Sequence, residues 1–148
     1  MSQSILPAET VVGNAGEIAA RLPSTARCGT SLIMVIAVLR TCGFVRALRL
    51  IRWMARDVRL SCDEPHETAE SVARRVALIA AFYPGRARCL EQSLTLYWLL
   101  RRMGMDAVIR LGVQPVSFAA HAWVEYQRIP VHEGELVATV LPFSELPI

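Results

Sequence analysis

CLEQSLTLYWLLRRMGMDAVIRLGV, residues 89–113, changes character at Gly104, and this change decides the fold. Before Gly104, leucines and aromatic residues recur at helical spacing and leave little polar surface, which predicts a buried central helix from Cys89 to about Met103. A glycine just past the last helical residue is a common helix end. Beyond it, the β-branched and alternating residues from Ala107 to Val113 predict a strand.

Outward from this stretch, the upstream half contains helical patterns and the downstream half contains strand patterns. The helices are predicted over residues 14–22, from Thr30 or Ser31 to about Ala55, and over residues 66–82. Gly43 lies inside the long helix and is expected to bend or divide it. Two further strands are predicted over 118–127 and 136–143, and the short connections favour antiparallel pairing.

Helices followed by a sheet indicate an α+β fold. A chain of 148 residues is long enough to bury one core without cross-links. We therefore expect one compact domain, in which an N-terminal helical segment (1–60) packs on a core (61–148).

Composition excludes several classes of protein. The chain is 53% hydrophobic and 20% charged, which is typical of a folded globular domain. The net charge of +3 is too small and too mixed for a nucleic-acid-binding face. The four cysteines form no Cys-x-x-Cys pair, so no zinc site is expected. Residues 1–13 lack the pattern of a secretory signal, and the apolar run Leu32–Leu39 is shorter than the about 20 residues of a membrane span, so a cytoplasmic protein without membrane contact is expected.

Cys89 is the first candidate for chemistry, because it follows the Pro84-Gly85 break where the buried helix is predicted to begin. A helix N-terminus carries partial positive charge and free N–H groups, and Arg86 and Arg88 add positive charge, so this setting stabilises a thiolate. The alternative is an inert core thiol, since cysteine is often buried as a small apolar residue. That second interpretation applies to the other three cysteines: Cys28, Cys42 and Cys62.

His121 is the matching candidate for a base. It lies in the predicted strand FAAHAWVE (118–125), where alternation places it on one face with Ala119 and Trp123. A histidine among small and aromatic residues is either a hydrogen-bonded core residue or a general base for a nucleophile packed against that face. A cysteine on a helix followed by a histidine on a strand is the chain order of papain-like cysteine enzymes.

A third group is expected to orient the imidazole, and it should lie near the start of the next strand. Glu133 is the preferred candidate, with His132 and Glu135 as alternatives, and an exposed turn acid is the competing interpretation of Glu133. Asp106 lies too close to the end of the central helix to be favoured. The donors to an oxyanion are expected from Gln92 or, preferably, from the backbone N–H of the nucleophile.

Arginines recur at helical spacing through the end of the first half. They are Arg40, Arg46, Arg49, Arg52, Arg56 and Arg59. One interpretation is the solvated face of an amphipathic helix. The other is a docking face for a partner protein, an acidic peptide or a membrane surface.

Four blocks of the second half resemble the lasso-peptide leader peptidases, which are microcin-processing, transglutaminase-like proteins of bacterial lasso-peptide gene clusters. The blocks are PGRARCLEQSL (84–94), LLRRMG (99–104), LGV (111–113) and FAAHAWVE (118–125). The resemblance is clearest over residues 69–125. It implies a transglutaminase-like core with a Cys-His-Asp triad, in which Cys89 is the nucleophile and His121 the base. Members of that family usually have Asp where Glu133 stands here.

The resemblance also implies a reaction and partners. A leader peptidase cuts a ribosomally made precursor peptide through an acyl-enzyme, with no metal or organic cofactor. A chain of 148 residues has little room for its own leader-recognition domain. The resemblance therefore implies a stand-alone form that works with a separate leader-recognition protein and an ATP-dependent cyclase. Two alternatives stay open: an acyltransferase or transglutaminase with the same Cys-His pair, and a non-enzymatic partner protein.

Overall fold

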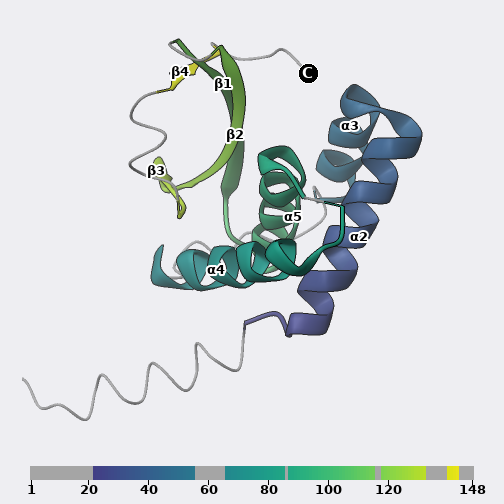
Figure 1. Ribbon diagram of the computed structural model, residues 1–148. Coiled ribbons are helices and arrows are strands. Elements are labelled where there is room, and N and C mark those ends of the chain that lie inside the picture. The colour runs from purple at the N-terminus through teal and green to yellow at the C-terminus, as the bar shows by residue number, and fades with distance from the viewer. Residues whose placement is uncertain (1–21, 56–65, 86, 116–117, 133–139, 144–148) are drawn as a thin grey trace, which may run out of the picture.

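The structure is a computed structural model that describes residues 22–55, 66–85, 87–115, 118–132 and 140–143. Within these ranges the helices come first, as α2 (Thr25–Cys42), α3 (Phe44–Met54), α4 (His66–Phe82) and α5 (Cys89–Arg102). The strands follow as β1 (Ala107–Gln114), β2 (Ala119–Tyr126), β3 (Ile129–Pro130) and β4 (Leu141–Pro142). This order confirms the predicted α+β fold (Figure 1).

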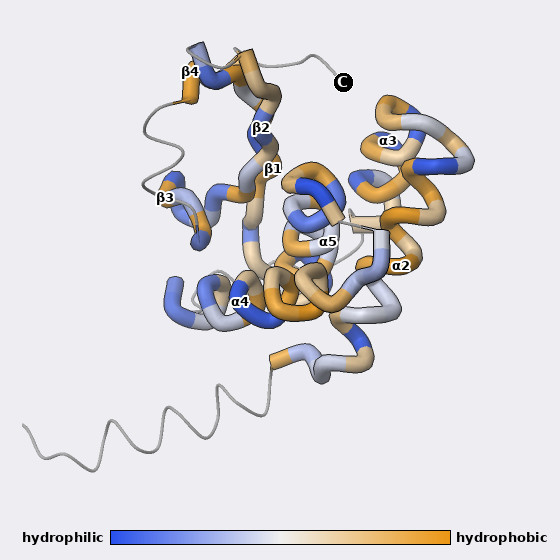
Figure 2. The backbone as a smooth tube through the Cα atoms, viewed as in Figure 1, coloured by the Kyte–Doolittle hydropathy of each residue, from blue (hydrophilic) through white to orange (hydrophobic). Residues whose placement is uncertain are grey.

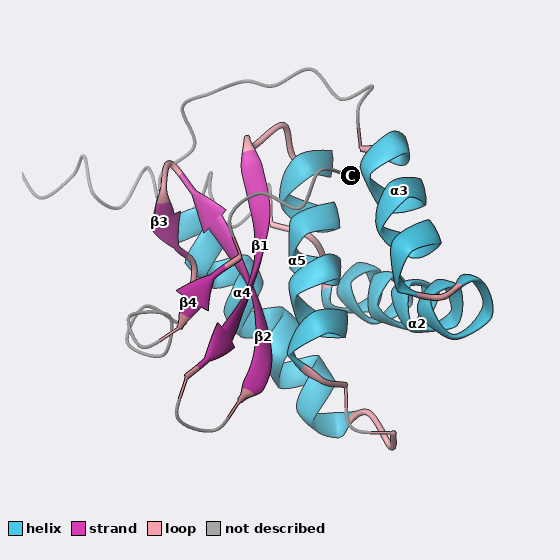
Figure 3. Cartoon of the chain, turned by 90° about the horizontal axis from the view of Figure 1, so that it is seen from above, coloured by secondary structure: helices cyan, strands magenta, loops and turns pink. Residues whose placement is uncertain are grey.

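Helix α5 is the centre of the fold. It lies between the sheet and α3, and it also packs against α2 and α4 (Figures 1 and 3). Leu94 and Leu100 of this helix are completely buried, and burying a leucine side chain contributes roughly 1.5–3 kcal/mol to folding. The helix predicted from Cys89 to Met103 is confirmed to within one residue, because the apolar period ends next to Gly104, whose φ is 87°.

The long helix predicted from Thr30 or Ser31 begins earlier and is divided in two. Ser24 caps α2, because its hydroxyl oxygen accepts a hydrogen bond from a backbone N–H of the first turn at 3.3 Å. Thr30 lies inside the helix, and its hydroxyl donates to the carbonyl one turn earlier instead. Gly43, with a φ of 74°, separates α2 from α3 as expected. The short helix predicted over 14–22 falls almost entirely outside the described residues.

The sheet has the strand order β3-β2-β1-β4, and every pair is antiparallel, as predicted. Ile129–Pro130 lies in the connection between the strands predicted over 118–127 and 136–143, and it pairs with the end of β2 as an additional strand, β3. The chain reverses there through Gln127-Arg128, two residues with φ of 54° and 65°, in place of the usual Asn-Gly or Asp-Gly turn. Of the strand predicted over 136–143, only the last part falls in the described residues, where it forms β4.

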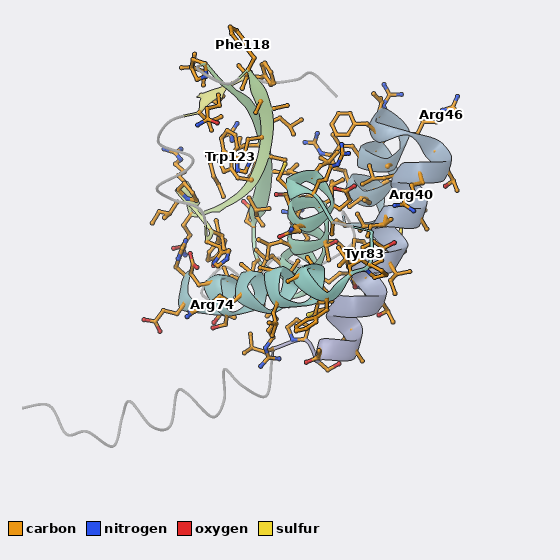
Figure 4. The ribbon with its side chains drawn as sticks, viewed as in Figure 1. Arg40, Arg46, Arg74, Tyr83, Phe118 and Trp123 are labelled. Atoms are coloured by element: carbon orange, nitrogen blue, oxygen red, sulfur yellow. The ribbon has the colours of Figure 1, made fainter. Side chains whose placement is uncertain are left out.

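The two faces of β2 have different surroundings. Val124 is buried in the core, and the Ser93 hydroxyl of α5 donates to the Ala122 carbonyl oxygen at 2.8 Å. Alternation places His121 and Trp123 on the opposite face, and Trp123 extends from β2 on the side away from α5 (Figure 4). Packing of one face of β2 on α5 thus fixes the position of the His121 backbone.

Helix α2 is long and apolar enough to cross a membrane, judged by length and composition alone. Its apolar segments are visible along the tube in Figure 2. Four of its side chains are buried in the protein: Cys28, Leu32, Val35 and Ile36. The core helix of a globular protein passes the same test, so this finding is weak evidence for a span. The helix is longer than the run Leu32–Leu39 on which the sequence expectation depended.

Candidate active site

Cys89 is the first residue of α5. Two side chains from the first turn of the helix hold the backbone just before it. Glu91 Oε2 accepts a hydrogen bond from the Arg88 N–H at 3.0 Å. The Gln92 carboxamide donates to the Ala87 carbonyl oxygen at 2.8 Å. The sulfur therefore lies at a braced helix N-terminus, where the helix dipole and the first N–H groups stabilise an anion.

A cavity of about 390 Å³ lies beside Cys89. It is lined by residues of two helices, the hairpin and the segment after β4: Phe44, Cys89, Leu90, Leu111, Gly112, Ala120, His121, Ala122 and Phe143. The structure thus brings Cys89 and His121 to one cavity, although 32 positions separate them in the sequence. Phe44 and Phe143 were not recognised from the sequence, since no local pattern connects either residue with the helix that begins at Cys89.

The imidazole of His121 stacks on the indole of Trp123, with ring centroids 6.2 Å apart and planes inclined by 12°. Trp123 Nε1–H donates to Glu125 Oε1 at 3.1 Å. Glu125 Oε2 in turn accepts from Arg110 Nε at 3.2 Å, and Arg110 lies opposite Trp123 in the hairpin. These side chains form a row that extends from His121 along one face of the sheet. The alternation that predicted the shared face of His121 and Trp123 also pointed to Glu125, which the sequence interpretation did not include.

The Cys89 thiol makes no hydrogen bond within the described part of the chain. Cysteine enzymes often have long or poorly aligned catalytic contacts before substrate binds. A direct contact between the sulfur and the His121 imidazole therefore stays a prediction for the substrate-bound protein.

The candidates for the third catalytic group are in different places. Glu133 and Glu135 lie outside the described residues. His132 is held away from the cavity, because its backbone N–H donates to Glu70 Oε1 at 2.7 Å and its ring Nδ1 lies 3.9 Å from Glu70 Oε2. Asp106 lies just beyond the C-terminal end of α5, at the opposite end of the helix from Cys89. Its Oδ1 forms an ion pair with Arg101 Nη1 at 2.6 Å.

Gln92 is directed away from the cavity. Its carboxamide is engaged with the Ala87 carbonyl, and the residue lines a second cavity of only about 30 Å³ between α4, α5 and β2. The N–H groups at the start of α5 therefore stay the preferred candidates for oxyanion donors. Among the described residues, no three His, Cys, Asp or Glu side chains are grouped to hold a metal ion.

The other cysteines have different settings. Burial raises the pKa of the Cys28 thiol, with the charge of Arg75 opposing that effect. Cys42 is exposed at the end of α2, and Cys62 lies outside the described residues. Cys89 is the one cysteine in the described ranges that lines the large cavity.

Gly112 is a position where the site tolerates no side chain. A Cβ atom there would meet Val140 Cγ1 at 2.5 Å and the Leu141 carbonyl oxygen at 2.6 Å, so the backbone before and within β4 would have to move. We expect Gly112→Ala to lower the free energy of unfolding by about 1–3 kcal/mol, as overpacking does in other cores. Urea unfolding followed by circular dichroism measures this change.

Gly29→Ala is the matched control for this substitution. The nearest atom to a Cβ at Gly29 is Ile79 Cγ2 at 3.9 Å, an ordinary contact distance. Since alanine is favoured over glycine inside a helix by roughly 0.5–1 kcal/mol, this variant should be neutral or stabilised. Equal unfolding midpoints for the two variants would show that β4 does not pack on Gly112 in this way.

Comparison with known proteins identifies a family for the chain. The sequence matches the family model of the transglutaminase-like superfamily over residues 31–146. The match begins inside α2 and includes α3, α4 and α5 as well as strands β1 to β4. No curated protein and no solved structure matches the chain.

Proposed function

This chain belongs to the transglutaminase-like superfamily, and from that premise we propose that it is a cysteine peptidase that removes the leader from a lasso-peptide precursor. Membership indicates a cysteine-dependent enzyme of the protease or acyltransferase type. The observation that carries the proposal is the position of Cys89 at the N-terminus of α5, on a cavity that His121 also lines. The blocks around these two residues, which resemble lasso-peptide leader peptidases, support the narrower activity.

In the proposed reaction, His121 accepts the proton of the Cys89 thiol, and the sulfur attacks the carbonyl carbon of the scissile peptide bond. The first N–H groups of α5 donate hydrogen bonds to the oxyanion. The C–N bond breaks as the imidazolium gives its proton to the leaving amine of the core peptide, and the leader remains as a thioester. Water, deprotonated by His121, then hydrolyses the thioester and restores the thiol.

These steps require the imidazole to meet the sulfur at hydrogen-bond distance. The ring stacks on Trp123, on the face of β2 away from α5, so we propose that the start of β2 changes conformation when substrate binds and brings the ring to the cavity. Glu133 is proposed as the group that orients the ring, because it stands where the resembling family has Asp. A Glu133→Gln protein with unchanged turnover would assign that role to another group.

The outer face of α3 supports the proposal of a separate recognition partner. Arg46, Arg49 and Arg52 are exposed on this helix, and Arg46 extends away from the rest of the protein in Figure 4. No Asp or Glu occurs between Thr25 and Met54. Within the described ranges, no carboxylate pairs with these three arginines. Such a face attracts an acidic surface of a recognition protein or leader peptide.

We expect the double substitution Arg49→Glu/Arg52→Glu to weaken binding of the recognition protein or the leader by at least about ten-fold at low salt, because each reversal replaces attraction by repulsion. Binding is measured by calorimetry at two salt concentrations, since screening should reduce the difference. Thermal unfolding should change little, as both side chains are exposed.

Arg27→Glu/Arg74→Glu is the matched control, with the same charge change at two exposed positions outside α3. This variant should bind normally. If both double variants bind equally well, the arginines of α3 form only a solvated face.

The test of the function itself combines the purified chain with a precursor peptide and a recognition protein, both to be sought among the neighbouring reading frames. Mass spectrometry should find the free leader and the free core peptide, together adding to the precursor mass plus one water. A product that joins the leader to an added amine instead would identify the acyltransferase alternative. An intact precursor in every mixture, with the Cys89 thiol unreactive toward iodoacetamide, would identify a non-enzymatic partner protein.

A further inference from the structure

The lining of the large cavity is almost entirely apolar. Apart from Cys89 and His121, the cavity is lined by aliphatic, aromatic and glycine residues. Phe44 from α3 and Phe143 after β4 both reach it, and Phe143 is 48% exposed. A surface of this kind gains free energy when an apolar group covers it, and it offers few hydrogen bonds to a polar one.

Hydrogen bonds in the surrounding framework keep this cavity from closing. The Phe143 N–H donates to the Leu111 carbonyl oxygen at 2.9 Å, so the segment after β4 is attached to β1. The Ser93 hydroxyl holds β2 to α5 through the Ala122 carbonyl oxygen. On β2 itself, alanines at positions 120 and 122 leave the space open, where larger side chains would fill it.

The volume of the large cavity also indicates the size of the substrate group that fits it. About 390 Å³ lies within the roughly 300–1,000 Å³ typical of ligand pockets, and it exceeds what a single large side chain needs. The cavity of about 30 Å³ that Gln92 lines has room for little more than a water molecule. Within the described part of the chain, the cavity beside the nucleophile is therefore the larger receptor for a substrate group.

We propose that this cavity receives a bulky apolar side chain of the substrate, located within one residue of the carbonyl that Cys89 attacks. The inference rests on the proposed function, because Cys89 must be the nucleophile for the adjoining cavity to select the cleavage site. The substrate class is thus a peptide with a large aliphatic or aromatic residue next to the scissile bond. Because Phe44 lines the cavity, the first half of the chain also contributes to this selectivity.

The probes for this proposal are dipeptide chloromethyl ketones, Ac-Xaa-Ala and Ac-Ala-Xaa, with phenylalanine, leucine, glutamine or aspartate as Xaa. Labelling forms a bond from the Cys89 sulfur to the methylene carbon and releases chloride, so intact-protein mass spectrometry follows its rate. Burying an apolar side chain should make the phenylalanine and leucine probes react about ten-fold to a hundred-fold faster than the glutamine probe, in at least one of the two positions. Equal second-order rates for all probes would overturn the inference.

Two variants locate the effect in the cavity. Ala120→Phe fills the space and should remove the preference for phenylalanine, and labelling by the small reagent iodoacetamide shows whether the thiol itself still reacts. Ala26→Phe, at an exposed position of α2 that does not line the cavity, is the control and should retain the preference. If Ala120→Phe does not fold, Phe143→Ala removes one wall instead and should lower the preference at least three-fold.

The outcomes separate this inference from the proposed function. A Cys89 thiol that reacts with neither the ketones nor iodoacetamide would contradict the nucleophile assignment, and the inference would fall with it. A thiol that reacts with iodoacetamide and with all ketones at similar rates would leave the nucleophile assigned and overturn only the apolar selectivity. A preference that survives in Ala120→Phe and Phe143→Ala alike would overturn the assignment of this cavity.

Discussion

Cleavage of the precursor should stop in a Cys89→Ala protein, while folding and precursor binding persist. The sulfur is the atom that forms the proposed acyl-enzyme, and its removal leaves no nucleophile at the start of α5. We expect the rate constant for cleavage to fall below about a thousandth of the wild-type value, as with other covalent nucleophiles. Stability should change by less than about 1 kcal/mol, because the side chain is small and partly exposed.

The measurement is single-turnover cleavage followed by mass spectrometry, with precursor binding measured by calorimetry in parallel. Cys42→Ala is the matched control, since it removes a thiol from an exposed position that does not line the cavity. The control should cleave normally. A Cys89→Ala protein that cleaves at the wild-type rate would end the cysteine-peptidase proposal.

The second large effect is expected from His121→Ala. Loss of a general base slows proton transfer typically by about 10²–10⁴-fold, and cleavage should slow by that factor. Added imidazole should restore part of the rate, because the substitution leaves a space on the cavity and on the Trp123 ring. Precursor binding should be nearly unchanged. This combination separates a base from a residue that only packs on Trp123.

His66→Ala is the control for the loss of a stacked imidazole. The His66 ring stacks on Tyr126 with centroids 6.4 Å apart, and His66 does not line the cavity. This variant should retain cleavage and show no gain from imidazole. If both histidine variants lose activity equally and neither is rescued, the effect of His121 is structural.

Much of the fold, and the elements on which the two candidate site residues lie, were predictable because their signals are local. The apolar period from Cys89 to Met103 and the alternation around His121 depend only on neighbouring residues. The helix α5 and the strand β2 form where these two patterns predict them. The position of Cys89 at the beginning of α5 follows from the same reasoning, since the Pro84-Gly85 break predicts that a new helix starts after it.

Other features depended on contacts that no local pattern contains. Phe44 reaches the cavity because α3 packs beside α5, which is a result of tertiary packing. The strand β3 was not predicted, because Gln127-Arg128 forms a left-handed turn without the residues that usually signal one. The start of α2 at Ser24 was missed because two later hydroxyl residues offered the same capping chemistry.

The hydrogen bond from the Ser93 hydroxyl to the Ala122 carbonyl has a mechanical consequence for the site. Ser93 lies one helical turn after Cys89, and Ala122 directly follows His121, so a single bond sets the longitudinal register of helix against strand at the level of the cavity. A slip of one residue would displace the two catalytic candidates by about 3.3 Å and leave a buried hydroxyl unsatisfied. The bond thereby opposes sliding of the sheet along α5 at the level of the cavity, and fraying of the short edge strands β3 and β4 would leave the separation of Cys89 and His121 unchanged.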